Sequence, residues 1–248
     1  MSSEVHYLVD SDQPYPLLRL AGVLDVASAP EVRSALLDVL AGQPEAVVVD
    51  VGGLEVSDPA AVAVLRDVRR DTADWPAARL TLCNVRDATV WQSVGWPVWP
   101  DSDQAFAQLG APAANHRVSV DLEPQVGAAR RSRELISSAC DEWDRSDLAG
   151  SACIVVTEMV NNVVQHAHTS MILLVAAHGD GVSVAVRDHS GTVPSFTGAP
   201  APTSYGGRGM LLIDSVASRW GSLSLTDGKV VWALIADDGT GMTGPGRG

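Results

Sequence analysis

The sequence predicts an α/β (α+β) protein of two domains, and three features support this. In the first half, short apolar runs typical of strands alternate with stretches of helical periodicity. The segment 111–115 is small, contains proline and lacks periodicity, so it predicts a linker. Beyond it, helical stretches and apolar strands recur up to a glycine-rich end. We therefore expect a mixed sheet with helices at 1–110, a second α/β domain at 116–236, and a flexible tail at 237–248.

The first domain is expected to place helices over a small mixed sheet. Ser28 suits the N-cap of its first helix and Gly42 the end of that helix. Pro59 suits the first turn of a later helix. The apolar run 46–51 is typical of a strand covered on both faces. The predicted strands are 5–10, 17–23, 46–51 and 79–84, and the predicted helices are 29–41, 59–70, 88–94 and 102–109.

The second domain is expected to combine three helices with five strands. Its first helix is predicted to begin at Pro124, and the turn 178–181 is expected to join two strands as a hairpin. The segment 194–205 is rich in Pro, Gly, Ser and Thr, which predicts a mobile loop. The predicted strands are 116–122, 171–177, 182–187, 222–226 and 230–235, and the predicted helices are 124–143, 149–167 and 210–218.

Composition excludes several functional classes. The net charge of −13 argues against a nucleic-acid-binding surface, because phosphate contacts need clustered Lys and Arg. No signal peptide opens the chain and no apolar run approaches membrane-spanning length, so we expect a soluble, cytoplasmic protein without a membrane role. The three cysteines are odd in number and lack metal-ligand spacing, which indicates buried or free thiols in a reducing compartment. Lys229 is the only lysine, and by itself this indicates nothing beyond composition.

A polar stripe lies on the apolar helix predicted at 149–167. Glu158, Asn162 and His166 are four residues apart, so they share nearly one helix face. A carboxylate, an amide and an imidazole there are consistent with a solvated helix edge and equally with a functional site.

Two further patterns favour the functional interpretation. Asp188 follows an apolar strand, and Gly206-Gly207-Arg208-Gly209 opens a helix. A glycine-rich loop at a helix start lets backbone N–H groups approach a polyphosphate. Each pattern alone is a weak signal of a functional site. Their order along the chain, with Glu-x-x-x-Asn before them, makes the combination a specific signal.

The first domain resembles a STAS domain, the fold of anti-sigma-factor antagonists, over about residues 5 to 109. In regulated STAS domains the helix start reads Asp-Ser-Ser-Gly and its first serine accepts a phosphate. This chain has Asp58-Pro59-Ala60-Ala61, which offers no hydroxyl, so a docking or packing role is favoured over that switch. Ser57 is a displaced alternative acceptor. The resemblance rests on Val48-Val49-Asp50-Val51, a turn expected at Gly52-Gly53-Leu54, Val56, Asp58, Val62, Val64 and Leu65.

The second domain resembles the GHKL, or histidine kinase-like, ATPase superfamily over about 116 to 236. Within it, the chain is most similar to bacterial anti-sigma-factor serine kinases. The phosphoacceptor helices of a histidine kinase and the transducer domain of gyrase-type enzymes have no counterpart in the sequence. The motifs that carry the resemblance are Thr157-Glu158-Met159-Val160-Asn161-Asn162, His166-Ala167, Gly207 to Asp214, Arg219-Trp220-Gly221 and Gly228-Lys229-Val230-Val231-Trp232.

The resemblance implies a Mg·ATP site and a role for each motif residue. Asn162 would hold Mg²⁺ through its side-chain oxygen, and Glu158 would act as the general base. Asp188 would accept the adenine amino group, with Gly191 as a further adenine contact and residues 194–205 as a lid. The residues implied in phosphate binding are Gly207, Arg208, Gly209 and Met210.

The sequence departs from the superfamily pattern at two points. Where Asp-x-Gly-x-Gly is common, this chain has Asp188-His189-Ser190-Gly191-Thr192, so Gly191 is offset by one position. Val230 stands where threonine or serine often follows Gly-Lys, which predicts the loss of one polar contact to the base.

Two functions from different classes follow from these resemblances. The first is a regulator of transcription that binds ATP and Mg²⁺, phosphorylates a serine on a separate STAS antagonist and sequesters a sigma factor. The second is a non-catalytic ATP-binding module or scaffold whose fused STAS domain occludes the kinase's partner site. A weak ATPase is a third, simpler option. The resemblance also allows a homodimer, for which the sequence indicates no interface.

Overall fold

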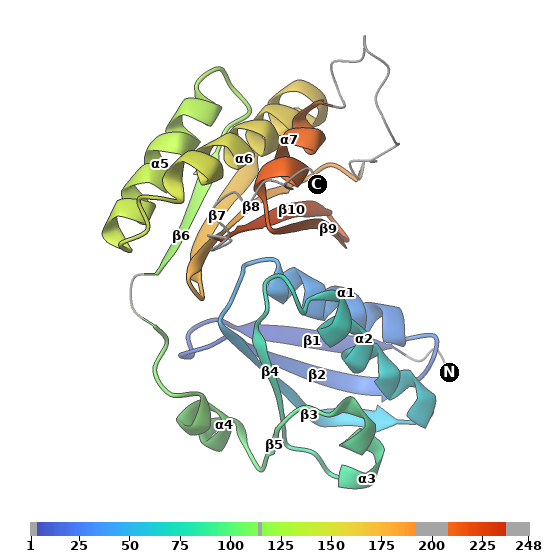
Figure 1. Ribbon diagram of the computed structural model, residues 1–248. Coiled ribbons are helices and arrows are strands. Elements are labelled where there is room, and N and C mark those ends of the chain that lie inside the picture. The colour runs from blue at the N-terminus through green and yellow to red at the C-terminus, as the bar shows by residue number, and fades with distance from the viewer. Residues whose placement is uncertain (1–3, 114–115, 192–207, 237–248) are drawn as a thin grey trace, which may run out of the picture. The chain divides into compact units, whose positions relative to one another are not determined.

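The computed structural model describes residues 4–113, 116–191 and 208–236. The chain divides into two compact units, Met1–Ala114 and Asn115–Gly248. Each unit has its own five-stranded sheet and its own helices (Figure 1). The α/β class predicted from the sequence is therefore confirmed.

The sheet of the N-terminal unit is mixed, as predicted. Its strand order is β1-β2-β3-β4-β5, with β1 antiparallel to β2 and the other neighbours parallel. The two-residue strand β5 is too short to leave a periodic signal in the sequence. The strands are β1 (Val5–Asp10), β2 (Leu17–Leu24), β3 (Ala46–Val56), β4 (Arg79–Cys83) and β5 (Val98–Trp99).

Helices pack against this sheet through side chains that alternate along the strands. The residues Ala105 and Phe106 of α4 pack against Val48 and Cys83, whereas Val47, on the opposite face of β3, is fully buried. A strand buried on both faces was predicted from the run 46–51. The helices are α1 (Ala29–Leu40), α2 (Ala63–Asp71), α3 (Ala88–Trp91) and α4 (Ser102–Leu109), with 3₁₀ turns at Pro59–Val62 (η1) and Gln92–Val94 (η2).

The turn predicted at Gly52-Gly53-Leu54 is wrong, because β3 continues through it to Val56. The pairing of β2 with β3 shifts register here, so that Arg19 faces Asp50 but Ala21 faces Gly53. One extra residue on β3 makes this a β-bulge. A Cβ at position 53 would lie 2.9 Å from the Ala21 Cβ, so the glycine permits close approach of two strands.

The C-terminal unit is an antiparallel sheet with three helices over one face (Figure 1). The apolar side chains of that face form one core with the helices. No helix in the described part of the chain has the length and apolarity needed to cross a membrane. The sheet order is β6-β7-β8-β10-β9. Its elements are β6 (Arg117–Leu122), α5 (Ala128–Glu142), α6 (Ala149–Asn162), β7 (Met171–His178), β8 (Gly181–Asp188), α7 (Arg208–Val216), β9 (Arg219–Leu225) and β10 (Gly228–Ile235).

The start predicted for α5 at Pro124 is wrong by four residues. The helix begins at Ala128, preceded by Gly127 with φ of 108°. A residue in this left-handed region cannot continue a helix, and glycine adopts it without strain. The segment before the helix is a turn, in which Gln125 N–H donates to the Glu123 carbonyl.

The helix predicted at 149–167 changes character near its end. The α-helical part stops at Asn162, and Val163–Ala167 forms a π-helical turn (η3). It closes with the His168 N–H donating to the Val163 carbonyl at 2.8 Å, and His168 itself has a left-handed φ of 55°. Such turns are rare and occur frequently at functional sites.

Among the described glycines of this unit, the one closest to another backbone segment predicts a strong effect of substitution. Gly228 has φ of +156°, and a Cβ there would lie 2.0 Å from the carbonyl oxygen of Asp188. We expect Gly228→Ala to lower the free energy of unfolding of the C-terminal unit by about 2–4 kcal/mol, measured by urea titration. Gly150→Ala, in α6, is the control, because the added Cβ would meet nothing within 4 Å; it should be neutral or stabilising by up to about 1 kcal/mol. Equal effects of the two substitutions would contradict this account.

The three cysteines are free, and their burial predicts different reactivities. Burial raises the pKa of the Cys83 thiol to about 12 and that of the Cys140 thiol to about 11. Only the thiolate is reactive, so both thiols stay protonated and inert at neutral pH. Cys153 is only partly buried. We expect iodoacetamide at pH 8 to modify Cys153 first in the folded chain, as measured by peptide mass spectrometry. Alkylation of Cys83 at a comparable rate in the folded protein would refute this.

Candidate functional site

The candidate site lies where α6, α7 and the ends of β8 and β10 meet in the C-terminal unit. The helix α6 packs against α7, β8 and β10. In the antiparallel sheet, the last residue of β8, Asp188, faces Lys229 near the start of β10. Residues distant in sequence thereby come together at one end of the unit.

Glu158 and Asn162 are both half-buried on α6. The Glu158 carboxylate accepts no hydrogen bond from any residue that the structure describes. The Asn162 Nδ2 lies 4.0 Å from the Met210 Sδ, which connects α6 to the first turn of α7. With its nitrogen toward the sulfur, the amide leaves its oxygen available for a ligand.

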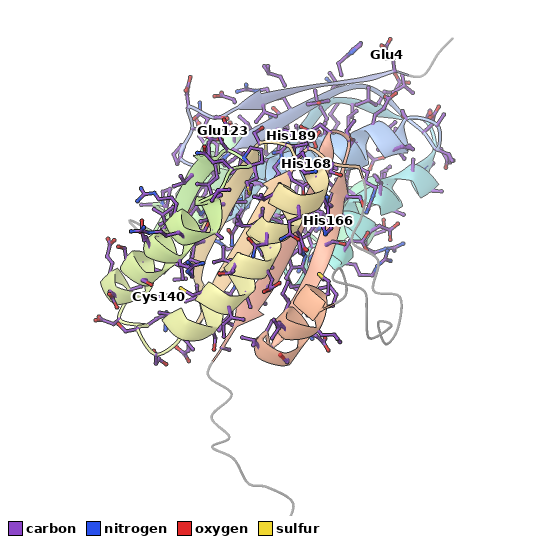
Figure 2. The ribbon with its side chains drawn as sticks, turned by 90° about the horizontal axis from the view of Figure 1, so that it is seen from above. Glu4, Glu123, Cys140, His166, His168 and His189 are labelled. Atoms are coloured by element: carbon purple, nitrogen blue, oxygen red, sulfur yellow. The ribbon has the colours of Figure 1, made fainter. Side chains whose placement is uncertain are left out.

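The third residue of the predicted stripe, His166, is exposed in the π-helical turn. Figure 2 shows His166, His168 and His189 at the same end of the unit. One backbone contact ties this end together, because the His189 N–H donates to the Thr169 Oγ1 at 3.2 Å.

Asp188 is buried and forms an ion pair with Lys229. Its side chain is 2% exposed and that of Lys229 is 7% exposed, with 2.8 Å between Nζ and Oδ1. The same Oδ1 accepts from the Ser190 N–H at 2.7 Å, and Nζ also donates to the Ser190 carbonyl at 3.3 Å. A buried ion pair of this kind is costly to break, by about 3–5 kcal/mol, because either charge left alone is poorly solvated.

Sequence reasoning missed this role of Lys229. The available signal was its uniqueness, because every other basic residue of the Lys and Arg class is arginine. The sequence pattern singles out Val230 instead. Side chains alternate along a strand, however, and Val231, two residues after Lys229, belongs to the core under the helices. Val230 therefore points to the opposite face, and the polar group beside Asp188 is the ammonium of Lys229.

The turn between β9 and β10 is tied to the end of β8. The Oδ1 of Asp227 forms an ion pair with Arg187 at 3.1 Å. The Nδ1 of His189 lies 3.5 Å from the Oδ2 of Asp227. These contacts, with the close approach at Gly228, fix the backbone on which Lys229 is carried.

The predicted phosphate-binding residues are described only in part. Arg208 and Gly209 form the first turn of α7, and Met210 there is buried. Gly191 is exposed, and a Cβ on it would meet nothing within 4 Å, so the described structure imposes no steric need for glycine there. Gly207, the predicted lid 194–205 and the predicted tail 237–248 lie outside the described residues.

Within residues 4–113, 116–191 and 208–236, no group of three or more His, Cys, Asp or Glu residues could hold a metal ion. A Mg²⁺ ion bound mainly by phosphate and water, with one amide oxygen such as that of Asn162, needs no such group. The second oxygen of Asp188, Oδ2, accepts no hydrogen bond from the described residues, whereas Oδ1 accepts two.

In the N-terminal unit, the expected switch position carries no acceptor. Asp58 caps the η1 turn, with Oδ1 accepting from the Ala60 N–H at 2.9 Å, and Pro59 occupies the first position of that turn. The alternative acceptor, Ser57, is exposed, and its hydroxyl donates to the Leu24 carbonyl at 3.4 Å.

Solved structures with some likeness to this chain include three bacterial proteins. An anti-sigma factor antagonist from Mycobacterium paratuberculosis is 18% identical, with a TM-score of 0.36 over 42% of this chain and 92% of that one. The RsbU and RsbW domains of a Mycobacterium tuberculosis protein are 18% identical, with a TM-score of 0.37 over 51% and 33%. A blue-light activated histidine kinase domain from Erythrobacter litoralis is 15% identical, with a TM-score of 0.29 over 83% and 95%.

No curated protein matches the chain significantly. Two family models match it, one in each unit. Residues 8–89 match the family described as Mlab, STAS domain. Residues 118–235 match the family described as histidine kinase-like ATPase domain. The protein therefore joins a STAS domain to a histidine kinase-like ATPase domain of the GHKL type.

Proposed function

We propose that this protein is a partner-switching regulator of the anti-sigma-factor class, whose ATPase-like domain binds Mg·ATP and phosphorylates a serine on a separate STAS antagonist. The observation that carries the proposal is that α6, which carries Asn162, packs against both α7 and β8, which carry Met210 and Asp188. Its expected partners are that antagonist and a sigma factor.

The binding role divides among three elements. The Oδ2 of Asp188 is available to accept from the amino group of adenine, since Lys229 and Ser190 occupy only Oδ1. The first turn of α7, Arg208 to Met210, would offer backbone N–H groups to the phosphates. The amide oxygen of Asn162 would hold Mg²⁺, which neutralises phosphate charge when bound.

The transfer role falls to Glu158, which lies one helical turn before Asn162. A general base must reach the hydroxyl that it deprotonates, and a carboxylate with no described hydrogen-bond partner is free to do so. The hydroxyl must come from another molecule or from Ser57, because Pro59 supplies none.

Pro59 also favours a second function, a non-catalytic module in which the fused STAS domain blocks the kinase's partner site. The position is exposed, as an acceptor position must be, yet it carries a ring without a hydroxyl. A domain of this kind would dock like a substrate and would not react.

Nucleotide binding is tested by calorimetric titration of the full chain with ATP and Mg²⁺. We expect saturable binding that Asn162→Ala weakens by roughly 10-fold or more, because a hard cation loses an oxygen ligand. Asn161→Ala is the matched control, with the same side chain one position away on α6, and should bind like the wild type. Saturable binding with no difference between the two variants would exclude Asn162 as the ligand, and no binding would exclude the proposed function.

Kinase activity is tested by incubating the chain with γ-labelled ATP and purified STAS proteins that carry Asp-Ser-Ser-Gly. We expect a labelled serine on such a partner, and a loss of rate of roughly 100-fold or more in Glu158→Gln, because general-base catalysis contributes on this scale. A Pro59→Ser variant separates the two functions. Labelling of that serine, without labelling of external partners, would support occlusion by the fused domain, but it would also show that the chain catalyses transfer and would refute a non-catalytic module. ATP binding without any labelling would leave the protein a binding module and refute the kinase.

A further inference from the structure

Lys229 is the only lysine of the chain, and it is buried against Asp188. Asp188 is the carboxylate that our proposed function assigns to binding the adenine of ATP. An ammonium group has three N–H donors. Two of them are used, toward the Asp188 Oδ1 at 2.8 Å and toward the Ser190 carbonyl at 3.3 Å. The third has no partner among the described residues, and neither has the Asp188 Oδ2.

The pair therefore offers one acceptor and one donor side by side in a nearly buried place. Such a pair suits a ligand edge that presents a hydrogen-bond donor to Oδ2 and an acceptor to the ammonium. Adenine has this edge, since its amino group donates and the adjacent ring nitrogen N1 accepts. Hypoxanthine in the same orientation would place an oxygen against Oδ2 and an N–H against the ammonium.

We propose that Lys229 determines base specificity: its third N–H donates to N1 of adenine while Asp188 accepts from the amino group. The inference rests on the proposed nucleotide binding and adds a second recognition contact to it. Lysine suits this position because its compact ammonium can bind two fixed acceptors and a ligand, whereas the planar guanidinium of arginine presents its donors in a rigid fork.

The backbone holds the ammonium at this point. Gly228 lies directly before Lys229 and approaches the Asp188 carbonyl so closely that a side chain would not fit. The sheet register pairs Lys229 with Asp188 across neighbouring strands. The donor and the acceptor are thus set by the fold before a ligand arrives, and a fixed pair discriminates between bases better than a mobile one.

The test is a thermodynamic cycle on the full chain, with binding measured by calorimetry. The ligands are ATP, 1-deaza-ATP, in which C–H replaces N1 and the amino group is kept, and inosine triphosphate. We expect wild type to bind 1-deaza-ATP roughly 10- to 100-fold more weakly than ATP, the range for a hydrogen bond to a charged group, and to bind inosine triphosphate more weakly still. In Lys229→Met the difference between ATP and 1-deaza-ATP should vanish.

Two further variants keep the result interpretable. Val230→Thr changes the neighbouring residue on the opposite face and should preserve the wild-type ratio of affinities. If Lys229→Met does not fold, the double substitution Asp188→Asn with Lys229→Met replaces it in the test. The double variant carries neither charge, so it leaves no unpaired charge buried. It should also fail to distinguish ATP from 1-deaza-ATP.

The outcomes separate this inference from the function on which it rests. If wild type binds ATP and 1-deaza-ATP equally, or inosine triphosphate as tightly as ATP, the role of Lys229 is refuted while nucleotide binding stands. A ratio that survives in Lys229→Met refutes it as well. If wild type binds none of the three nucleotides, the proposed function fails together with this inference.

Discussion

The buried ion pair between Asp188 and Lys229 is the contact on which the arrangement of the C-terminal unit's site depends. It joins the end of β8 to the start of β10. The backbone of Ser190 also binds the pair, because its N–H donates to Asp188 and its carbonyl accepts from Lys229. Because both charges are nearly buried, each stabilises the other, and the loss of either partner would leave the remaining charge poorly solvated. The pair therefore fixes where β8 ends and where the chain turns away toward Gly191.

The same end of the unit is fixed a second time from the helix side. The α-helical hydrogen bonding of α6 stops just after Asn162, and the π-helical turn at Val163–Ala167 leads the chain to Thr169, which accepts from the His189 backbone. The last α-helical residue is thus the one whose amide contacts Met210 of α7. A helix that continued straight would carry the chain past the strand end, so the change in pitch connects the helix layer to the sheet at this point.

Periodicity predicted most of the fold because most elements bury one face. The helices and strands of both units follow from alternating or helical apolar patterns, and the mixed sheet follows from their order. The misses occur where geometry depends on a contact distant in sequence. Nothing local distinguishes the β-bulge at Gly52 and Gly53 from a turn, because it is set by Ala21 on the neighbouring strand. The start of α5 was placed at a proline, whereas Gly127 with its left-handed φ decides it.

The candidate site was predictable to a similar extent. Glu158, Asn162 and Asp188 stood out because polar residues interrupt apolar elements. Lys229 did not, because a lysine near a turn is ordinarily exposed, and only the three-dimensional pairing shows that it faces a buried carboxylate. Whether a buried charge is compensated is a property of the register of β8 and β10, which no local pattern encodes.

The pairing also gives the two carboxylates of the candidate site different environments. Asp188 is neutralised by Lys229 and held by the Ser190 N–H, so it is fixed in place with one oxygen left over. Glu158 is half-buried, without a hydrogen bond from the described residues. A fixed, compensated carboxylate is suited to recognising a ligand group, whereas an uncommitted one is suited to accepting a proton. The different environments of two like residues therefore favour binding by Asp188 and proton transfer by Glu158, and it is the lysine that separates them.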